Sequence, residues 1–442
     1  MTDASLDDPS TRGAPPGNGA DTEFPALAAM LAGAVEPGEA DAQQEQEPIA
    51  PVPESERPCF RVYDAWTPLE GGRKLKPGVW LHAMKFNGKE LVTSDTWICG
   101  PLHLDAQTSD GTGNNFGRLL RFRNTAGRWR KWAMPMEMLS SAGAELRGEL
   151  LSMGLAIEDR ARADLARYLQ ERPPSKQVRC ALQVGWCGSV FVLPDTVIGP
   201  DAASVIFQSG EHGHEEHGQS GTLDGWRTEI AARAVDNPLF ALGLSAAFAG
   251  PLLARCNAEG GGLHFVGDSS TGKTTILEAA ASVWGGANYR RSWRATANGI
   301  EGAAALFNDC LLALDEISEC DPRDVGEVVY MLGNGRGKAR ASRTGSARSV
   351  ARWHSSVLST GERSIATTMA EGGQRVKAGQ AVRLLDVPCE RQHGAWDTLH
   401  GHSSGPAFSD AIKRASRQHC GTAGRAFLEK LTRDTQGMVD RL

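Results

Sequence analysis

The spacing of apolar residues divides the chain into a stretch of predicted strands and a later stretch of alternating helices and strands. From residue 58 to 199, short apolar runs alternate with glycine and turn residues, and Asn87-Gly88 is typical of a hairpin turn. Helical spacing occurs at 137–153 and 157–170. We therefore expect a separate α+β domain over 58–199. Four tryptophans are predicted for its core: Trp97, Trp129, Trp132 and Trp186.

The second stretch, from residue 223 to 442, has the alternation of an α/β fold. Helices are predicted at 226–235, 238–256, 274–283, 298–308, 322–332, 364–370 and 422–431. Strands are predicted at 263–266, 289–293, 310–314, 355–359 and 381–387. Asn298 with Glu301 has the spacing of a capping box, and Asp321 before Pro322 predicts an N-cap followed by a proline at the first helical position.

Charge is distributed unevenly along the 442 residues. Residues 1–57 hold 12 acidic and 2 basic side chains, so the other 385 residues hold 41 acidic and 45 basic ones. The net charge of −6 therefore describes an acidic tail on a slightly basic body. The tail is poor in large apolar residues, and we predict that 1–57 is disordered and solvated. An acidic arm that mimics nucleic acid or docks a partner is the alternative.

Several classes of protein are excluded at this stage. The N-terminus, MTDASLDDPS, has neither a basic start nor an apolar run, so a secretory signal is not expected. The uncharged stretch 237–254 is short and rich in small residues, which favours a buried helix over a membrane span. The nine cysteines include no CxxC pair, which favours reduced thiols. We expect a cytoplasmic protein that is not associated with a membrane.

A polar segment, 200–222, is expected to link the two domains. Three of its histidines, His212, His214 and His217, are close in sequence, and a metal site is one interpretation. A surface loop is the simpler interpretation, because the spacing fixes no further metal ligand.

A glycine-rich motif lies between a predicted strand and a predicted helix. Residues 267–274, GDSSTGKT, match GxxxxGK[ST] in the context that a phosphate-binding loop requires. In such a loop, backbone N–H groups surround the phosphates, Lys273 reaches phosphate oxygens and the Thr274 hydroxyl ligates Mg²⁺. The predicted ATP-binding residues are Gly267, Asp268, Ser269, Ser270, Thr271, Gly272, Lys273, Thr274 and Thr275.

A second motif follows 41 residues after Thr274, where the apolar strand 311–314 ends in Asp315 and Glu316. At this distance from a phosphate loop, Asp315 is predicted to hold Mg²⁺ and Glu316 to deprotonate the attacking water. This pairing predicts a hydrolase. A surface carboxylate is the alternative for Glu316.

A third motif is the polar end of the next predicted strand. A strand beside the Asp315 strand would place Ser359 or Thr360 near the γ-phosphate, as a sensor of the nucleotide. An ordinary cap for the helix that follows is the alternative.

A basic segment, 333–352, lies between the second and third motifs and holds six basic residues and no acidic one. It is predicted to form a β-hairpin that contacts a nucleic-acid backbone. A solvated loop, or arginines that reach a neighbouring subunit's ATP, are the alternatives. The predicted DNA-contacting residues are Arg336, Lys338, Arg340, Arg343 and Arg348.

In this order, the motifs resemble AAA+ ATPases that carry a hairpin before the first sensor, as in superfamily III and minichromosome-maintenance helicases. More closely, HFVGDSSTGKTTILEAAASVWG, RSWRATANGIEGAAALFNDCLLALDEISE and YMLGNGRGKARASR resemble the bacterial family called domain of unknown function 927. The resemblance covers roughly residues 75–430 and extends upstream through WICGPLHLDA and FVLPD. That family is linked to mobile elements, and related cassette-encoded members are thought to be replicative helicases.

The resemblance implies a hexameric, ATP-driven motor that translocates DNA. Single-stranded DNA is the expected substrate, and a primase or replication protein is a candidate partner. The resemblance also implies the phosphate and metal roles for Lys273 and Thr274, and the metal and water roles for Asp315 and Glu316. Arg383 is the candidate for an arginine that acts in trans on a neighbour's ATP. Arg363 and Arg375 are rivals, and a strand-surface arginine is the alternative for Arg383.

The predicted fold class is therefore α/β. An AAA+ P-loop NTPase core over 223–442, with a pre-sensor β-hairpin, follows a smaller α+β domain and a disordered acidic tail. Family members usually continue into a helical region with an arginine motif, so a chain that ends at Leu442 is expected to be a truncated or divergent copy. Two other functions stay open: a protein-remodelling or nucleotide-switch ATPase that ignores DNA, and a remnant that only binds ATP.

Overall fold

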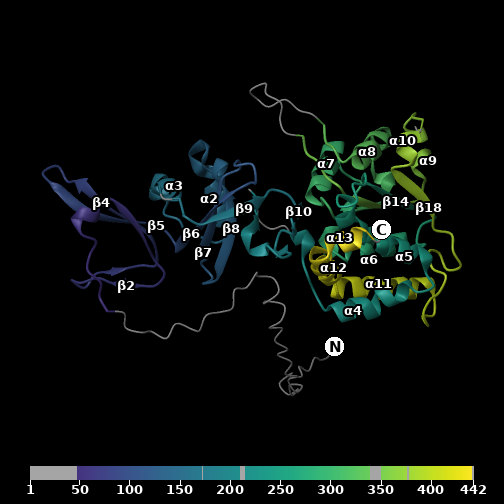
Figure 1. Ribbon diagram of the computed structural model, residues 1–442, viewed down its shortest axis with the longest axis horizontal. Coiled ribbons are helices and arrows are strands. Elements are labelled where there is room, and N and C mark those ends of the chain that lie inside the picture. The colour runs from purple at the N-terminus through teal and green to yellow at the C-terminus, as the bar shows by residue number, and fades with distance from the viewer. Residues whose placement is uncertain (1–46, 172, 210–214, 339–349, 376–377, 441–442) are drawn as a thin grey trace, which may run out of the picture. The chain divides into compact units, whose positions relative to one another are not determined.

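The computed structural model describes residues 47–171, 173–209, 215–338, 350–375 and 378–440 (Figure 1). Residues 1–46 of the predicted tail lie outside this part of the chain. Residues 47–57 belong to the folded structure, since Ile49 forms a β-bridge with Leu69 and Val52 is buried. The Arg57 guanidinium forms an ion pair with Asp95, 2.8 Å away.

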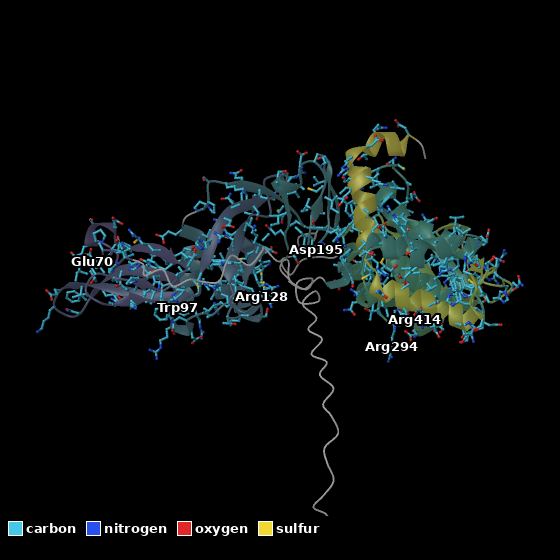
Figure 2. The ribbon with its side chains drawn as sticks, turned by 90° about the horizontal axis from the view of Figure 1, so that it is seen from below. Glu70, Trp97, Arg128, Asp195, Arg294 and Arg414 are labelled. Carbon is cyan, nitrogen blue, oxygen red and sulfur yellow. The ribbon has the colours of Figure 1, made fainter. Side chains whose placement is uncertain are left out.

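The first sheet is antiparallel, and its order is β1-β4-β5. A short two-stranded sheet, β2-β3, lies between β1 and β4 in sequence. Leu75 of β3 and Leu69, which follows β2, form a small apolar cluster with Trp80. Trp97, labelled in Figure 2, packs at the border of this cluster beneath the Lys76 ammonium, 3.3 Å from the ring centre. The strands are β1 (Cys59–Tyr63), β2 (Thr67–Pro68), β3 (Lys74–Leu75), β4 (Gly78–Phe86) and β5 (Leu91–Cys99).

The second sheet is mixed, with the order β13-β9-β6-β7-β8. Two helices, α2 (Ala144–Ser152) and α3 (Arg162–Glu171), contribute leucines to the core that this sheet shares with β4 and β5. Trp132 lies in that core, as predicted, whereas Trp129 is only half-buried. The strands are β6 (Leu102–Ser109), β7 (Gly117–Arg123), β8 (Trp129–Pro135), β9 (Gln177–Ala181) and β13 (Val205–Phe207).

A third, three-stranded sheet packs against the later part of the chain. Phe191 on β11 and Ile198 on β12 belong to the same apolar cluster as the 223–442 segment. The predicted place of Trp186 is therefore wrong, because its ring packs on this cluster and its indole N–H donates to the Pro251 carbonyl at 2.7 Å. The strands are β10 (Gly185–Cys187), β11 (Val190–Val192) and β12 (Val197–Ile198).

The later segment contains a five-stranded parallel sheet with the order β15-β16-β17-β14-β18. Its strands are short and apolar, which is typical of a sheet covered on both faces. Strand β17 pairs with both β14 and β16, so the polar end of β17 lies between the ends of the other two. The strands are β14 (Gly261–Val266), β15 (Arg291–Ser292), β16 (Leu311–Asp315), β17 (Ser356–Gly361) and β18 (Leu384–Pro388).

Helices cover both faces of this sheet, with α5 and α6 on one side and α8, with α7 packed on it, on the other (Figure 1). The helices of this segment are α4 (Leu223–Glu229), α5 (Pro238–Leu253), α6 (Lys273–Ala281), α7 (Ala297–Leu306), α8 (Pro322–Asn334), α9 (Ile365–Glu371), α10 (Ala378–Ala381), α11 (Gly405–Gln418), α12 (Thr422–Arg433) and α13 (Thr435–Val439). Across the described ranges, no helix combines the length and the apolar character that crossing a membrane requires.

Helix α5 is the predicted small-residue helix, and its glycines explain that composition. A Cβ at Gly250 would lie 2.5 Å from the Cys310 carbonyl oxygen, and one at Gly243 would lie 2.3 Å from the Ile276 side chain. Small residues therefore let α5 approach β16 and α6 closely, and the helix is buried as predicted.

Two local predictions need correction and one is confirmed. Helix α7 begins before Asn298, because the Thr296 hydroxyl caps it by accepting from the Gly299 N–H at 3.2 Å. Strand β18 begins at Leu384, since the residues before it turn through the short helix α10. The N-cap at Asp321 before Pro322 is confirmed.

Candidate nucleotide-binding site

The glycine-rich loop joins β14 to α6, which confirms the predicted strand–loop–helix context. Ser270 and Gly272 have φ values of 62° and 107°, and this left-handed backbone turns the loop toward the start of α6. Trp396 lies against the loop, since a Cβ at Gly272 would be 3.0 Å from its indole ring. Glycine is therefore required at 272 both by its backbone conformation and by the packing of Trp396.

Lys273 is the first residue of α6, and its side chain folds back over the loop. Its ammonium donates to the carbonyl oxygens of Gly267 at 2.7 Å and Asp268 at 2.5 Å, and lies 3.4 Å from the Thr271 hydroxyl. The residue is only 6% exposed, although Asp268, Ser269 and Ser270 are exposed. A buried ammonium satisfied by loop oxygens has the charge and the donors to bind phosphate oxygens instead. Thr275, on the same helix, is buried.

Three predicted residues meet where β14, β16 and β17 end. Parallel pairing sets Leu314 of β16 beside Ser359 of β17, so their following residues are neighbours. The Thr360 hydroxyl donates to Asp315 Oδ1 at 2.6 Å, and the Thr274 hydroxyl lies 3.3 Å from the same oxygen. Hydroxyl and carboxylate oxygens are the ligands that Mg²⁺ prefers, so Thr274 and Asp315 fit the predicted metal.

Glu316 is held in an uncommon backbone conformation. Its φ is 57°, which is rare for a residue other than glycine. Its backbone N–H donates to the Thr360 hydroxyl at 3.2 Å, and its carboxylate accepts from the Ser318 hydroxyl at 2.6 Å. Thr360 therefore connects both acidic residues of the motif, and Ser318 fixes the direction of the Glu316 carboxylate.

Ser359 points into the sheet core rather than toward Asp315. Its hydroxyl accepts from the Trp293 indole N–H at 2.9 Å and lies 2.8 Å from His264 Nδ1. His264 Nε2 lies 2.9 Å from the Arg363 carbonyl, which can only accept, so Nε2 carries the proton and Nδ1 accepts from Ser359. Burial lowers the pKa of His264, which keeps this imidazole neutral. Of the two candidates for the sensor, only Thr360 is in direct contact with Asp315.

Replacing Thr360 by valine is expected to lower the free energy of unfolding by about 1–3 kcal/mol. Valine keeps the shape but removes the hydroxyl, so Asp315 loses a donor and the Glu316 N–H loses its acceptor. Chemical denaturation measures the loss. Hydrolysis of ATP is expected to fall as well, because both acidic residues lose a fixed position.

Thr367→Val is the matched control, since this exposed threonine shares its hydroxyl hydrogen bond with Ser364 at the start of α9. We expect it to leave ATP hydrolysis unchanged. Equal rates for Thr360→Val and the wild type would contradict a role for the Thr360 hydroxyl at the site.

The candidate trans-acting arginines occupy different settings. Arg383 precedes β18, where its side chain donates to Asn334 at 3.1 Å and to the Gly379 carbonyl at 2.5 Å, with its guanidinium 4.7 Å from the Tyr330 ring centre. Arg363 follows β17 and pairs with Glu371 on the surface. Arg375 is exposed.

The basic segment is described only at its two ends. Arg336 and Arg352 form an antiparallel bridge, and the Gly337 N–H donates to the Ala351 carbonyl at 2.9 Å. Arg336 and Lys338 are exposed, and Lys338 forms an ion pair with Glu327 at 2.7 Å. The other predicted DNA contacts, Arg340, Arg343 and Arg348, lie outside the described residues.

The histidine segment yields no metal site among the residues whose placement is described. His217 is buried, with its ring centre 5.2 Å from that of Tyr289 and 5.6 Å from that of Phe307. His212 and His214 lie outside the described residues.

Two contacts at the site carry no signal in the sequence. Trp396, which packs on the phosphate loop, lies 124 residues after Gly272 in the chain. The Arg290 guanidinium lies 3.0 Å from Asp315 Oδ2. Neither belongs to a motif with fixed spacing, so only the tertiary structure identifies them.

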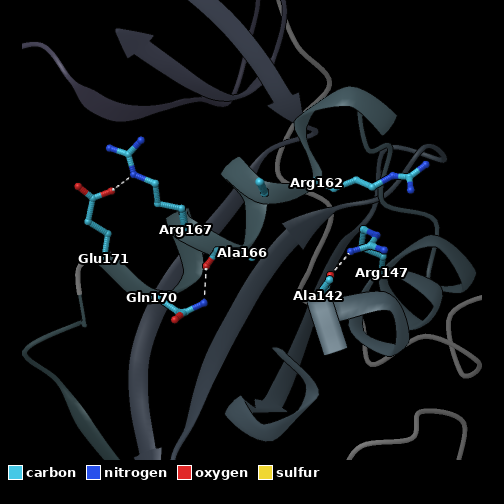
Figure 3. Close-up of a pocket in the computed structure, with 8 residues that line it drawn as sticks. Ala142, Arg147, Arg162, Ala166, Arg167, Gln170 and Glu171 are labelled. Carbon is cyan, nitrogen blue, oxygen red and sulfur yellow. Dashed lines mark hydrogen bonds and ion pairs between the residues drawn. The ribbon is translucent and has the colours of Figure 1, made fainter. Parts of the chain in front are cut away.

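A separate cavity of about 640 Å³ lies between α2 and α3, far in sequence from the motifs (Figure 3). Three arginines line it, and each has a partner within the chain. Arg167 pairs with Glu171, Arg162 with Asp159, and Arg147 donates to the Ala142 carbonyl. The arginines are thus satisfied by neighbouring groups, and the cavity adds nothing to the nucleotide site.

A parallel sheet, a glycine-rich loop that opens a helix, and a carboxylate at the end of a nearby strand together define the P-loop class of proteins. The chain belongs to the family described as domain of unknown function (DUF927), whose model matches residues 69–352. The family predicted from the motifs is therefore confirmed. A comparison with curated proteins finds no significant match.

Solved structures extend the comparison to the fold. The chain is similar to a structure described as "SCCmec type IV Cch - active helicase", with 20% identity and a TM-score of 0.59. The match covers 82% of this chain and 65% of that chain, so this chain spans less than two thirds of its length. The described part of this chain thus shares its fold with that structure. The apo A form of the NrS-1 C-terminal region matches with 8% identity over 76% of this chain and 71% of that one, but its TM-score is only 0.33.

Proposed function

We propose that this chain is an ATP-hydrolysing AAA+ motor, and that it acts as a DNA helicase or translocase in the replication of a mobile genetic element. The observation that carries the proposal is the meeting of Thr274, Asp315 and Thr360 beside Lys273. The helicase-like fold supports the choice of a motor over another kind of P-loop enzyme.

The proposed roles follow from the charges and contacts. Residues 267–275 would hold the phosphates, with Lys273 exchanging loop carbonyls for phosphate oxygens. Thr274 and Asp315 would hold Mg²⁺, which supplies positive charge against the phosphates when it is bound. Glu316 orients the attacking water and accepts its proton. Thr360 positions both acidic residues. Ser359 would act indirectly, because its hydroxyl anchors β17 to Trp293 and so holds the neighbouring Thr360 in place.

DNA binding is proposed from the basic segment 333–352. Its cations would neutralise backbone phosphates, and the antiparallel bridge at its base supports a hairpin that projects them together. The near-neutral charge of residues 58–442 removes the objection that an acidic protein would repel DNA.

The proposed assembly is a homo-oligomer, namely a hexamer. In such an assembly, one subunit's arginine would stabilise charge on its neighbour's ATP. Arg383 remains the candidate, with Arg363 and Arg375 as rivals. Arg383 would have to release Asn334 and the Gly379 carbonyl to reach a neighbour, whereas Arg363 would release one surface ion pair. A cytoplasmic setting and a primase partner belong to the same proposal.

Arg340→Glu is expected to remove most of the stimulation of ATP hydrolysis by single-stranded DNA. The substitution reverses a charge in the centre of the basic segment, so phosphate contacts weaken while the nucleotide site stays intact. Steady-state ATPase assays over a range of DNA concentrations measure the effect. Arg414→Glu, at an exposed arginine on α11, is the matched control. Unchanged stimulation in Arg340→Glu would refute the role of this segment.

A further inference from the structure

An arginine outside every motif lies against the metal-binding residue of the proposed site. Arg290 stands directly before β15, and its Nη1 is 3.0 Å from Asp315 Oδ2 and 3.1 Å from Glu278 Oε1. Glu278 belongs to α6, the helix that begins at Lys273. The three side chains are 34%, 22% and 18% exposed, respectively, so solvent screens these pairs less than fully exposed ones.

The two oxygens of Asp315 have different partners. Oδ1 receives the hydroxyls of Thr274 and Thr360, whereas Oδ2 receives the Arg290 guanidinium. A carboxylate with donors on one oxygen only can rotate and tilt. Donors on both oxygens fix its plane, and here they fix it with Oδ1 beside the hydroxyl of Thr274.

Charge around the site is compatible with a cation. Arg290 lies between two carboxylates, so Asp315, Arg290 and Glu278 together keep one negative charge. Arg417 of α11 approaches the far side of Glu278 at 3.8 Å, and its side chain is 65% exposed. Glu278 offsets much of the Arg290 charge. The guanidinium therefore orients Asp315 while the attraction of Asp315 for a metal ion is little reduced.

We propose that Arg290 is a positioning residue, which holds Asp315 Oδ2 so that Oδ1 faces the Mg²⁺ of the bound nucleotide. The inference rests on the proposed function, because it presupposes that the loop binds Mg²⁺-nucleotide. Groups that hold a metal-binding carboxylate in this way typically contribute about 10-fold to 100-fold to metal affinity or activity.

The test is a Mg²⁺ titration of the binding of a fluorescent ADP analogue. The Mg²⁺ midpoint is the concentration at which Mg²⁺ has half of its full effect on binding of the analogue. Arg290→Ala and Arg290→Met are expected to raise this midpoint about 10-fold. Affinity for the analogue in EDTA is expected to stay unchanged, because Arg290 contacts carboxylates and not the phosphate loop. Arg290→Lys should keep a Mg²⁺ midpoint close to that of the wild type. One nitrogen of the arginine makes both contacts, and an ammonium can do the same.

Arg294→Ala is the matched control, at an exposed arginine four residues further along the chain (Figure 2). Arg290→Met keeps most of the unbranched stem of the side chain but not the guanidinium, so it replaces Arg290→Ala if the shorter variant does not fold. An unchanged or lower Mg²⁺ midpoint in the folded variant would overturn the positioning role. Failure of the wild type to bind the analogue at any Mg²⁺ concentration would instead overturn the proposed function.

Discussion

Replacing Lys273 by alanine is expected to reduce ATP hydrolysis at least about 100-fold, the loss typical when a group that stabilises developing charge is removed. The Lys273 ammonium is buried, and its donors are directed at the loop that would surround the phosphates. Alanine keeps the helical start of α6 but leaves the phosphate charge without this partner. The rate of phosphate release in the presence of Mg²⁺ measures the loss.

Two observations make this result interpretable. Lys430→Ala, at an exposed lysine on α12, is expected to hydrolyse ATP at the wild-type rate. Thermal unfolding shows whether Lys273→Ala remains folded. We expect it to fold, because water can donate to the loop carbonyls that lose the ammonium. A folded Lys273→Ala variant with wild-type turnover would contradict the assignment of the loop.

Glu316→Gln is expected to bind ATP normally but to hydrolyse it about 100-fold to 10,000-fold more slowly, as for the loss of a general base. Glutamine can still accept from the Ser318 hydroxyl, so the local structure is retained while the proton acceptor is lost. Rapid-quench measurement of a single turnover separates binding from chemistry. Glu319→Gln, at the exposed last residue of the short 3-10 helix Ile317–Glu319 that Glu316 caps, is the matched control.

The same variant tests assembly. If the chain forms the proposed oligomer around ATP, Glu316→Gln should hold it assembled when ATP is added, and size-exclusion chromatography should show an early peak. A monomer under these conditions would favour the alternative that the chain binds ATP without completing a ring.

Local sequence was sufficient for the parts of the site in which neighbouring residues act together. The loop before Lys273 and the two carboxylates at the end of β16 were predictable, because backbone geometry joins each motif to its strand or helix. The assumption that the strand of Ser359 and Thr360 lies beside the Asp315 strand is confirmed, because β16 and β17 are paired. The contact between Thr360 and Asp315 comes from the structure alone.

Distant packing accounts for most of what the sequence did not reveal. Arg290 and Trp396 reach the site through tertiary contacts that no spacing encodes. The choice between Ser359 and Thr360 depended on which side chain faces the core. The contacts with Trp293 and His264 show that Ser359 faces the core. The predicted start of α7 was wrong because the Thr296 hydroxyl, two residues before Asn298, caps the helix in place of the Asn298 carboxamide.

The central claim is that a Mg²⁺-dependent ATPase site in this chain drives movement on DNA. The most direct measurement is the ATP hydrolysis rate of the purified wild type with no DNA, with single-stranded DNA and with double-stranded DNA. The account predicts turnover that requires Mg²⁺ and rises when single-stranded DNA is added. Turnover that ignores both DNAs would contradict the motor on DNA and favour a remodelling or switch ATPase, and no turnover in any condition would contradict the hydrolase itself.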